Sequence, residues 1–310
     1  MKPPAHHGLI FPLYNTRLML EITQPTRRMD QFQAMRPAPV KRRGKMRLWI
    51  LLFLILPLAY FLAPIRTNIL ILGTDDSSER GSVGRTDTII LASVVPLKPY
   101  IGMLSIPRDL WVQVPGVGEQ RINTAYFFSE ADQPGTGGEA AMLAIRENFG
   151  VPVRYYAVVH MSGLLSVVDA LGGVDIQLDS PASGLPAGEY HLNGAQALAF
   201  VRDRSASDDF GRMTHTQVLL SAIIKKALEP ASWRNLPQFA LALSQSVDTN
   251  IPAWQFPRLF FALLRAPLFG IESRTITREM VTPFQTAQGA QVLLPNWEAI
   301  RPLVREMFGR

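Results

Sequence analysis

The feature that most constrains this chain is an uncharged apolar run from Leu48 to Ile65, LWILLFLILPLAYFLAPI, bounded by Arg47 and Arg66. As a helix with a rise of about 1.5 Å per residue, these eighteen residues would extend roughly 27 Å, close to the hydrocarbon thickness of a bilayer. A cleaved signal peptide is the alternative, but the preceding segment is too long and no A-x-A site follows. The sequence therefore predicts a transmembrane helix over residues 48–65.

Charge is unevenly divided around this run. Residues 1–47 hold ten Lys and Arg against Glu21 and Asp30, a net charge of +8, so the total of +6 leaves −2 for residues 48–310. Residues 1–47 also lack apolar periodicity, which predicts a mostly disordered basic tail. The positive-inside rule keeps this tail in the cytoplasm and places residues 66–310 outside it, in a single-pass protein of the cell membrane. A slightly acidic globular part argues against a nucleic-acid partner.

Several common chemistries are excluded by composition and motif. The chain has no cysteine, which excludes disulfides, thiolate metal sites and thiol nucleophiles. Its five histidines show no zinc-ligand spacing, and neither a Walker loop nor a G-x-S-x-G motif is present.

Alternating apolar segments predict an α/β fold for residues 66–310. We expect a single α/β/α sandwich domain around a central mixed sheet, with a helical C-terminal part at residues 231–310. The expected strands lie at residues 68–72, 89–95, 101–106, 111–123, 154–160, 174–178 and 272–278. The expected helices lie at residues 137–149, 193–198, 213–228, 232–247, 254–264 and 296–308, and a further helix ends at Leu171.

Charged residues stand where three of these strands end or begin. Asp75 follows the first strand, Arg85 and Asp87 precede the second, and Arg108 and Asp109 follow the third. Open α/β sheets bind ligands at such edges, so we expect these side chains to share one site.

The segment from Phe200 to Gln217 has the highest density of charge. It places Arg202, Arg204, Arg212 and His215 among Asp203, Asp208 and Asp209. If its apolar lead-in, residues 197–201, is extended, Arg202 and Arg204 emerge on one face, where such closely placed cations need carboxylates or a polyanion. Asp208 or Asp209 would cap the following helix and turn Arg212 toward the site. A salt-bridged surface loop is the alternative.

Six motifs follow one another in a distinctive order: Ile71-Leu72-Gly73-Thr74-Asp75, Arg85-Thr86-Asp87-Thr88, Ser105-Ile106-Pro107-Arg108-Asp109, Arg121-Ile122-Asn123, Val168 to Asp175, and Phe200 to Arg212. By their order and spacing, residues 67–228 resemble the LytR-CpsA-Psr family. The resemblance implies a membrane-anchored phosphotransferase that moves a glycopolymer phosphate from a polyprenyl-pyrophosphate carrier onto cell-wall peptidoglycan. It also implies an apolar cleft between sheet and helices for the polyprenyl tail.

The resemblance also implies residue roles. Mg²⁺ would be held by Asp75 and Asp87. The expected catalytic residues are Asp75, Arg85, Asp87, Arg108, Arg202, Arg204, Asp209 and Arg212, with the arginines on the pyrophosphate. The expected substrate-binding residues are Arg121, Asn123, His215 and Gln217. The general base stays open among Asp75, Asp87 and Asp209, because magnesium ligands are poor bases.

One position departs from the family pattern: His215 stands where an arginine is usual. If His215 contacts the pyrophosphate, substrate affinity should rise as the pH falls through about 7.

Three other functions remain open from the sequence. The same site could hydrolyse a pyrophosphate-linked lipid with water as acceptor. The chain could also be a non-catalytic envelope sensor or transcriptional regulator, although no helix-turn-helix is evident on the cytoplasmic side. A glycan-binding anchor is the third alternative, although it would not need the clustered arginines and aspartates.

Overall fold

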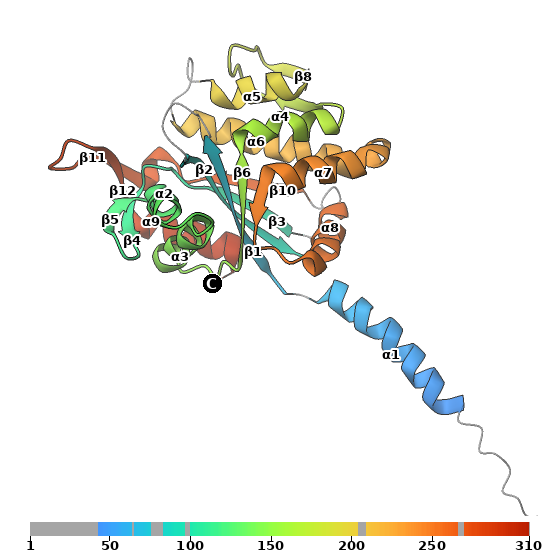
Figure 1. Cartoon of the computed structure of the whole chain (residues 1–310). Coiled ribbons are helices and arrows are strands. Elements are labelled where there is room, and N and C mark those ends of the chain that lie inside the picture. Colours follow the sequence, from blue (N-terminus) through green and yellow to red (C-terminus); the bar gives the residue numbers. More distant parts are fainter. Residues whose placement is uncertain are drawn as a thin grey trace, which may run out of the picture. The chain divides into compact units, whose positions relative to one another are not determined.

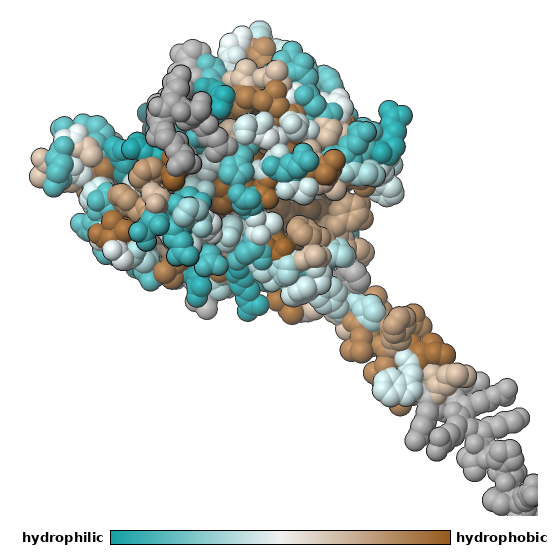
Figure 2. Space-filling view, viewed as in Figure 1, coloured by the Kyte–Doolittle hydropathy of each residue, from teal (hydrophilic) through white to brown (hydrophobic). Residues whose placement is uncertain are grey.

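The computed structural model describes residues 43–63, 65–75, 83–96, 100–203, 209–265 and 270–309. Contacts divide the chain into two units, Met1–Ile55 and Leu56–Arg310. Helix α1 (Arg43–Leu62) begins in the first unit, and Figure 2 shows its apolar side chains at the surface. None of the helices within the described residues combines the length and apolar character needed to cross a membrane.

The second unit is built on a six-stranded mixed sheet (Figure 1). The order of its strands is β10 (Ile271–Thr275), β3 (Tyr100–Ser105), β2 (Arg85–Val95), β1 (Thr67–Asp75), β6 (Tyr155–His160) and β9 (Val247–Thr249). The pairs β1 with β6 and β10 with β3 are parallel, and the other pairs are antiparallel. The expected α/β domain with a central mixed sheet is confirmed.

The two faces of the sheet pack against different helices, because successive strand residues point to opposite sides. Leu70 and Leu72 of β1 face a core cluster that includes residues of α2 (Thr124–Asp132), α3 (Gly137–Phe149) and α9 (Trp297–Phe308). Ile69 and Ile71 face the other way, toward clusters that include residues of α6 (Asp209–Leu228) and α8 (Phe256–Leu264). The sheet is thus the middle layer of three.

A further apolar cluster lies beyond α6. It joins α6 to α4 (Met161–Ala170), to the hairpin of β7 (Val174–Leu178) and β8 (Gly188–Leu192), and to α5 (Gly194–Arg202). Figure 1 shows α4, α5 and α6 gathered beside the sheet. Asn193 and Gln196 form a capping box at the start of α5, and the buried Ala197, Phe200 and Val201 follow at helical spacing. The segment before Arg202 is therefore not extended, because the helix that was expected at residues 193–198 continues as far as Arg202.

The remaining elements include two small hairpins and the C-terminal helices. The hairpins consist of β4 (Trp111–Val114) with β5 (Gly118–Arg121), and of β11 (Val281–Gln285) with β12 (Gln291–Pro295). The helices are η2 (Pro230–Asn235), α7 (Leu236–Ser246), η3 (Ala253–Gln255) and η5 (Arg278–Met280). Strands β11 and β12 were not predicted from the sequence, because Pro283 and Pro295 lie in a pattern that otherwise favours strands.

The chain enters the domain at one end of β1 and reaches the charged residues at the other. At the first end, Arg66 donates hydrogen bonds from Nη1 to Ser93 Oγ (2.8 Å) and to the carbonyl of Met307 (2.6 Å). Arg258, only 3 % exposed, donates from Nη2 to the carbonyls of Ala63 (3.0 Å) and Ile65 (2.8 Å). These bonds fix the point from which β1 runs.

At the far end of β1, a bulge in β2 singles out Asp87. The register pairs Gly73 with Thr88 and Thr74 with Thr86, so Asp87 stands opposite no residue of β1. A bulge of this kind locally bends the strand and re-aims the extra side chain. Gly73, the residue of β1 that pairs with Thr88 beside the bulge, must be small, since a Cβ atom built on it would lie 3.0 Å from Thr88 Cβ.

This close contact predicts the effect of Gly73→Ala. The added methyl group would push Thr88 away and disturb the bulge, and overpacking of this kind costs about 1–3 kcal/mol. We expect a lower melting temperature for the purified variant and a loss of activity beyond that explained by the unfolded fraction. A melting temperature equal to that of the wild type would show that the bulge does not depend on glycine.

Candidate active site

Two adjoining hollows lie where β1 ends and β2 begins. The larger, which we name the arginine cleft, has a volume of about 440 Å³ and is lined by Asp75, Val83, Gly84, Arg85, Asp87, Arg108, Asp109, Arg121, Asn123 and Phe127. The smaller, which we name the inner cavity, has about 50 Å³ and is lined by Asp75, Asp87, Thr88, Met161, Val201, Arg202, Arg212, Met213 and Thr216. Asp75 and Asp87 line both, so the two hollows form one candidate site.

Ion pairs organise the cations of this site. Arg202 Nη2 lies 2.9 Å from Asp75 Oδ1, which joins α5 to the end of β1. Arg108 Nη1 lies 2.7 Å from Asp87 Oδ1, which joins the loop after β3 to the bulge. Asp109 sits between two arginines, with Oδ2 3.4 Å from Arg108 Nε and Oδ1 3.2 Å from Arg121 Nε. Because guanidinium groups are planar forks, these pairs also fix the direction in which each points.

The described lining side chains carry an excess of positive charge. The arginines are Arg85, Arg108, Arg121, Arg202 and Arg212, and the carboxylates are Asp75, Asp87 and Asp109, which leaves a net charge of +2. The carboxylates Asp75, Asp87 and Asp109 are 34, 22 and 21 % exposed, so the pairs are only partly screened by water. A site with this balance favours an anionic ligand.

Arg85 and Arg212 are held differently from the other arginines. The guanidinium carbon of Arg85 lies 5.7 Å from the ring centre of Phe127 on α2, within cation–π range, and the side chain is exposed. Arg212 lies in the first turn of α6 and lines the inner cavity, as expected from the sequence.

Asn123 is the most buried of the predicted site residues in the arginine cleft, at 6 % exposure. Its N–H donates to the carbonyl of Arg108 (3.3 Å), and its own carbonyl accepts from Thr86 Oγ1 (3.3 Å). These bonds hold the start of α2 against β2 and against the loop that carries Arg108.

Two predicted site residues fall partly or wholly outside the described part of the chain. Arg204 is not among the described residues, and Asp209 is described only as the first residue of α6.

His215 and Gln217 are buried outside the two hollows. His215 is 7 % exposed, its ring centre lies 4.8 Å from that of Phe200, and its Nδ1 is 3.3 Å from Ser183 Oγ. Gln217 is 6 % exposed and donates from Nε2 to the carbonyl of Arg274 at 2.6 Å, which ties α6 to β10. Each residue is held inside the domain by packing and hydrogen bonds, and neither lines the two hollows.

Other residues of the site were not among those predicted from the sequence. Thr88, Phe127 and Thr216 line the hollows. Asp109 also lines the arginine cleft, and it was expected to share the site because it follows Arg108 at a strand end. Phe127 had no such signal, since the helix that carries it was not predicted.

The two shared aspartates are a donor set that fits a magnesium ion. Mg²⁺ in phosphoryl-transfer sites is held by one or two carboxylates together with substrate phosphates and water. Asp75 and Asp87 both line the two hollows, and the ion pair of each uses Oδ1. No group of three or more Asp, Glu or His side chains in the described segments is arranged as a complete metal cage. A magnesium ion here would therefore depend on the phosphates of a substrate.

The environment of His215 predicts a pH dependence of stability. Burial lowers the pKa of His215 below its ordinary 6.5, and the charge of Asp203 opposes this shift. A histidine with a lowered pKa in the folded state stabilises the fold fully above the unfolded pKa and loses that contribution as the pH falls below it. We expect denaturant unfolding between pH 7.5 and 5 to show wild type losing stability relative to His215→Gln.

The matched control for this prediction is His191→Gln, because His191 is 56 % exposed. Parallel stability curves for wild type and His215→Gln would contradict the prediction. Substrate affinity should not rise at low pH through His215, in contrast to the expectation from the sequence.

Comparisons with known proteins identify the family of this chain. The LytR_cpsA_psr family profile matches residues 64–303. The protein named polyisoprenyl-teichoic acid–peptidoglycan teichoic acid transferase TagU, from Bacillus mycoides (strain KBAB4), is 34% identical over 191 residues, which cover 59% of this chain and 60% of the relative. The match with such curated relatives thus spans less than two thirds of their length.

Solved structures share the fold. The structure "TagT bound to LIIa-WTA" superposes with a TM-score of 0.63 at 23% identity, over 79% of this chain and 91% of that one. The crystal structure of B. subtilis TagV gives a TM-score of 0.62 at 25% identity, over 79% of this chain and 98% of that one. With a family profile that covers most of its length, this chain belongs to the LytR_cpsA_psr family.

Proposed function

We propose that this chain is a phosphotransferase that moves a glycopolymer phosphate from a polyprenyl-pyrophosphate carrier onto cell-wall peptidoglycan. The observation that carries the proposal is the candidate site formed by the arginine cleft and the inner cavity, whose linings together hold five arginines and three carboxylates at one end of the sheet. The names of relatives such as TagU, a teichoic acid transferase, support the same class of substrate and acceptor.

In the proposed reaction, a hydroxyl oxygen of the acceptor glycan attacks the phosphorus that carries the glycopolymer. A new P–O bond forms, and the bond from that phosphorus to the bridging oxygen breaks. The products are a phosphodiester between the two glycans and a polyprenyl phosphate, and the proton of the hydroxyl is released to a base. The general base stays unassigned, although Asp109 is poorly suited because both of its oxygens lie against arginines.

The arginines would supply most of the catalysis. Transfer of a phosphoryl group asks for little covalent help from the protein, so positioned positive charge on the transferring and leaving phosphates is the main requirement. Arg108 and Arg202 are already directed by their pairs with Asp87 and Asp75. They would bind the pyrophosphate without a large cost of ordering their side chains.

Asp75 and Asp87 would also hold Mg²⁺ in the site. The ion would supply further positive charge to the phosphates. The two carboxylates have a second role without it, because they keep neighbouring arginines apart and oriented.

We further propose that residues 48–65 anchor the chain in the cell membrane, with the basic tail in the cytoplasm and the domain outside. The support is the apolar composition of this run and the basic residues before it. This placement would bring the domain to both a lipid-linked donor and the cell wall.

The arginine assignment predicts large losses of activity. We expect Arg108→Ala and Arg202→Ala each to reduce turnover on the order of 10³-fold. The corresponding lysine variants should regain little of this turnover, because lysine cannot make the bidentate contacts. The measurement is phosphodiester formation from a labelled polyprenyl-pyrophosphate glycopolymer.

Arg301→Ala, on α9 and outside the cleft, is the matched control and should retain activity. Turnover like that of wild type in both Arg108→Ala and Arg202→Ala would defeat the site assignment. Release of glycopolymer phosphate without a phosphodiester would instead support the alternative, a pyrophosphate-lipid hydrolase.

The magnesium assignment predicts inhibition by EDTA and recovery with added Mg²⁺. Asp75→Asn and Asp87→Asn should raise the Mg²⁺ concentration needed for half-maximal turnover, because each removes a ligand charge. Asp132→Asn, an exposed position on α2, should leave that concentration unchanged. Wild-type turnover that is independent of metal would remove magnesium from the mechanism.

A further inference from the structure

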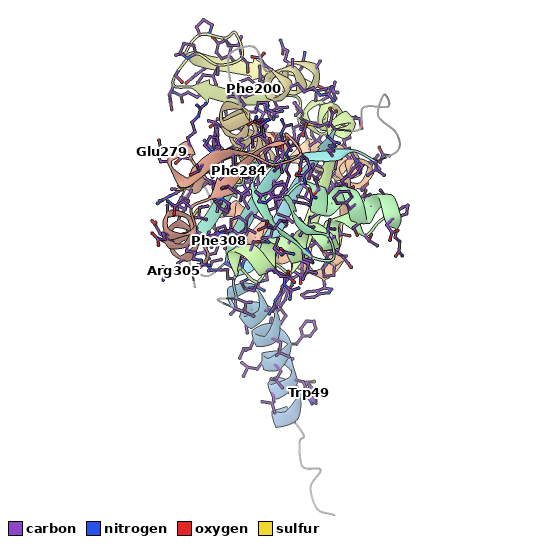
Figure 3. The ribbon with its side chains drawn as sticks, turned by 90° about the vertical axis from the view of Figure 1, so that its left-hand side faces the viewer. Trp49, Phe200, Glu279, Phe284, Arg305 and Phe308 are labelled. Carbon is purple, nitrogen blue, oxygen red and sulfur yellow. The ribbon has the colours of Figure 1, made fainter. Side chains whose placement is uncertain are left out.

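A second large hollow adjoins the arginine cleft, and none of the steps above uses it. It has a volume of about 420 Å³ and lies between the hairpin β4–β5 and the turn that joins β11 to β12, with Trp111, Glu119, Gln120 and Gln288 in its lining. We name it the hairpin hollow. Figure 3 looks onto the hairpin β11–β12, on which Phe284 is labelled.

The hairpin hollow and the arginine cleft share a wall. Arg85, Arg121 and Asn123 line both. Arg121 is fixed in this wall from two sides, since its Nη2 donates to the carbonyl of Gln291 on β12 (2.6 Å) and its Nε lies 3.2 Å from Asp109 Oδ1. A ligand in one hollow would therefore lie next to a ligand in the other.

The lining of the hairpin hollow suits an uncharged polyol. The amides of Gln120 and Gln288 can both donate and accept hydrogen bonds, as neighbouring sugar hydroxyls do. Trp111 offers an aromatic surface for the C–H face of a sugar ring. The carboxylate of Glu119 accepts hydrogen bonds from hydroxyls but repels a phosphate.

Asn123 adds an independent indication of the ligand. Both of its backbone groups are hydrogen-bonded, whereas its Oδ1 is buried and has no hydrogen-bond partner among the described residues. A buried acceptor left in this state costs about 1–3 kcal/mol. A pyrophosphate diester has no proton to donate at neutral pH, so the ligand that satisfies this oxygen must bring an O–H or N–H group.

We propose that the hairpin hollow binds a sugar of the acceptor glycan, and that Asn123 accepts a hydrogen bond from it. The inference rests on the transferase function proposed above. The acceptor sugar then lies on one side of the shared wall and the pyrophosphate on the other, with Asn123 between them. The class of ligand is an uncharged glycan of hydroxylated and N-acetylated sugars.

The test uses two probes on the purified full chain, an N-acetylglucosamine tetramer and inorganic pyrophosphate, followed by ligand-observed NMR titration. We expect the tetramer to bind wild type also when pyrophosphate is saturating. Asn123→Ala and Gln288→Ala should each lower the affinity for the tetramer about three- to tenfold, as the loss of a neutral hydrogen bond predicts. Gln288→Ala should leave the affinity for pyrophosphate unchanged.

Two variants serve as controls. Gln285→Ala lies on the same hairpin but outside the lining, and it should bind the tetramer as wild type does. Asn123→Asp keeps an acceptor oxygen at the same distance from the backbone, so its affinity for the tetramer should stay like that of wild type. Its new negative charge should lower the affinity for pyrophosphate in the arginine cleft.

Each contrary outcome is informative. Absence of tetramer binding, with pyrophosphate still bound, would overturn this inference and leave the proposed function intact. Displacement of the tetramer by pyrophosphate would place the sugar in the arginine cleft, and binding of sugar only when it is linked to the lipid carrier would assign the hollow to the donor. Either result would also overturn the inference. Failure of pyrophosphate to bind would count against the transferase itself.

Discussion

Guanidinium groups repel one another, and they can share one end of a sheet only if anions hold them there. Asp75 and Asp87 meet this requirement because β1 and β2 are antiparallel, so the last residue of one strand lies beside the first residues of the next. The bulge opposite Gly73 then frees Asp87 from the regular register. Each carboxylate reaches an arginine from a different element, and the loop after β3 and helix α5 are thereby drawn to the same place.

The same pairs explain why such a site can be stable before a substrate arrives. Partly buried charges are costly when unpaired, whereas paired ones cost less and keep their direction. An anionic ligand would then compete with carboxylates for arginines that already point at it. The described lining residues carry a net charge of +2, so the three carboxylates do not neutralise all of the arginines and an anionic ligand is still attracted.

Much of this arrangement could be predicted from the sequence, for local reasons. Asp75, Arg85 and Arg108 stand at the limits of apolar runs, and apolar runs identify buried strands well. The conformation of the segment before Arg202 was harder to predict, because short apolar runs fit both helix and strand. The capping box of Asn193 and Gln196 favours the helix. A pattern of residue types also could not show that His215 is buried, since its burial depends on contacts with Phe200 and Ser183, which lie outside its own helix.

The hairpin β11–β12 shows a second limit of sequence reasoning. Its strands are short and carry two prolines, and their position is set by distant contacts, such as the bond from the N–H of Leu293 to the carbonyl of Asp109 (3.0 Å). Only the folded chain reveals that residues near 288 lie beside residues near 120.

The length of β1 sets a distance that any membrane-bound form of this protein must respect. From Thr67 to Asp75 the strand rises roughly 26 Å, at about 3.3 Å per residue. Its lower end is pinned by Arg66 and Arg258 to the residues where the chain enters the domain. If β1 stands upright on a bilayer, the lipid-linked substrate of the proposed reaction must leave the headgroup layer by about the length of the strand. If β1 lies along the surface, the cleft meets the headgroups directly. The tilt of one strand thus decides how far the proposed carrier lipid must be extracted from the bilayer.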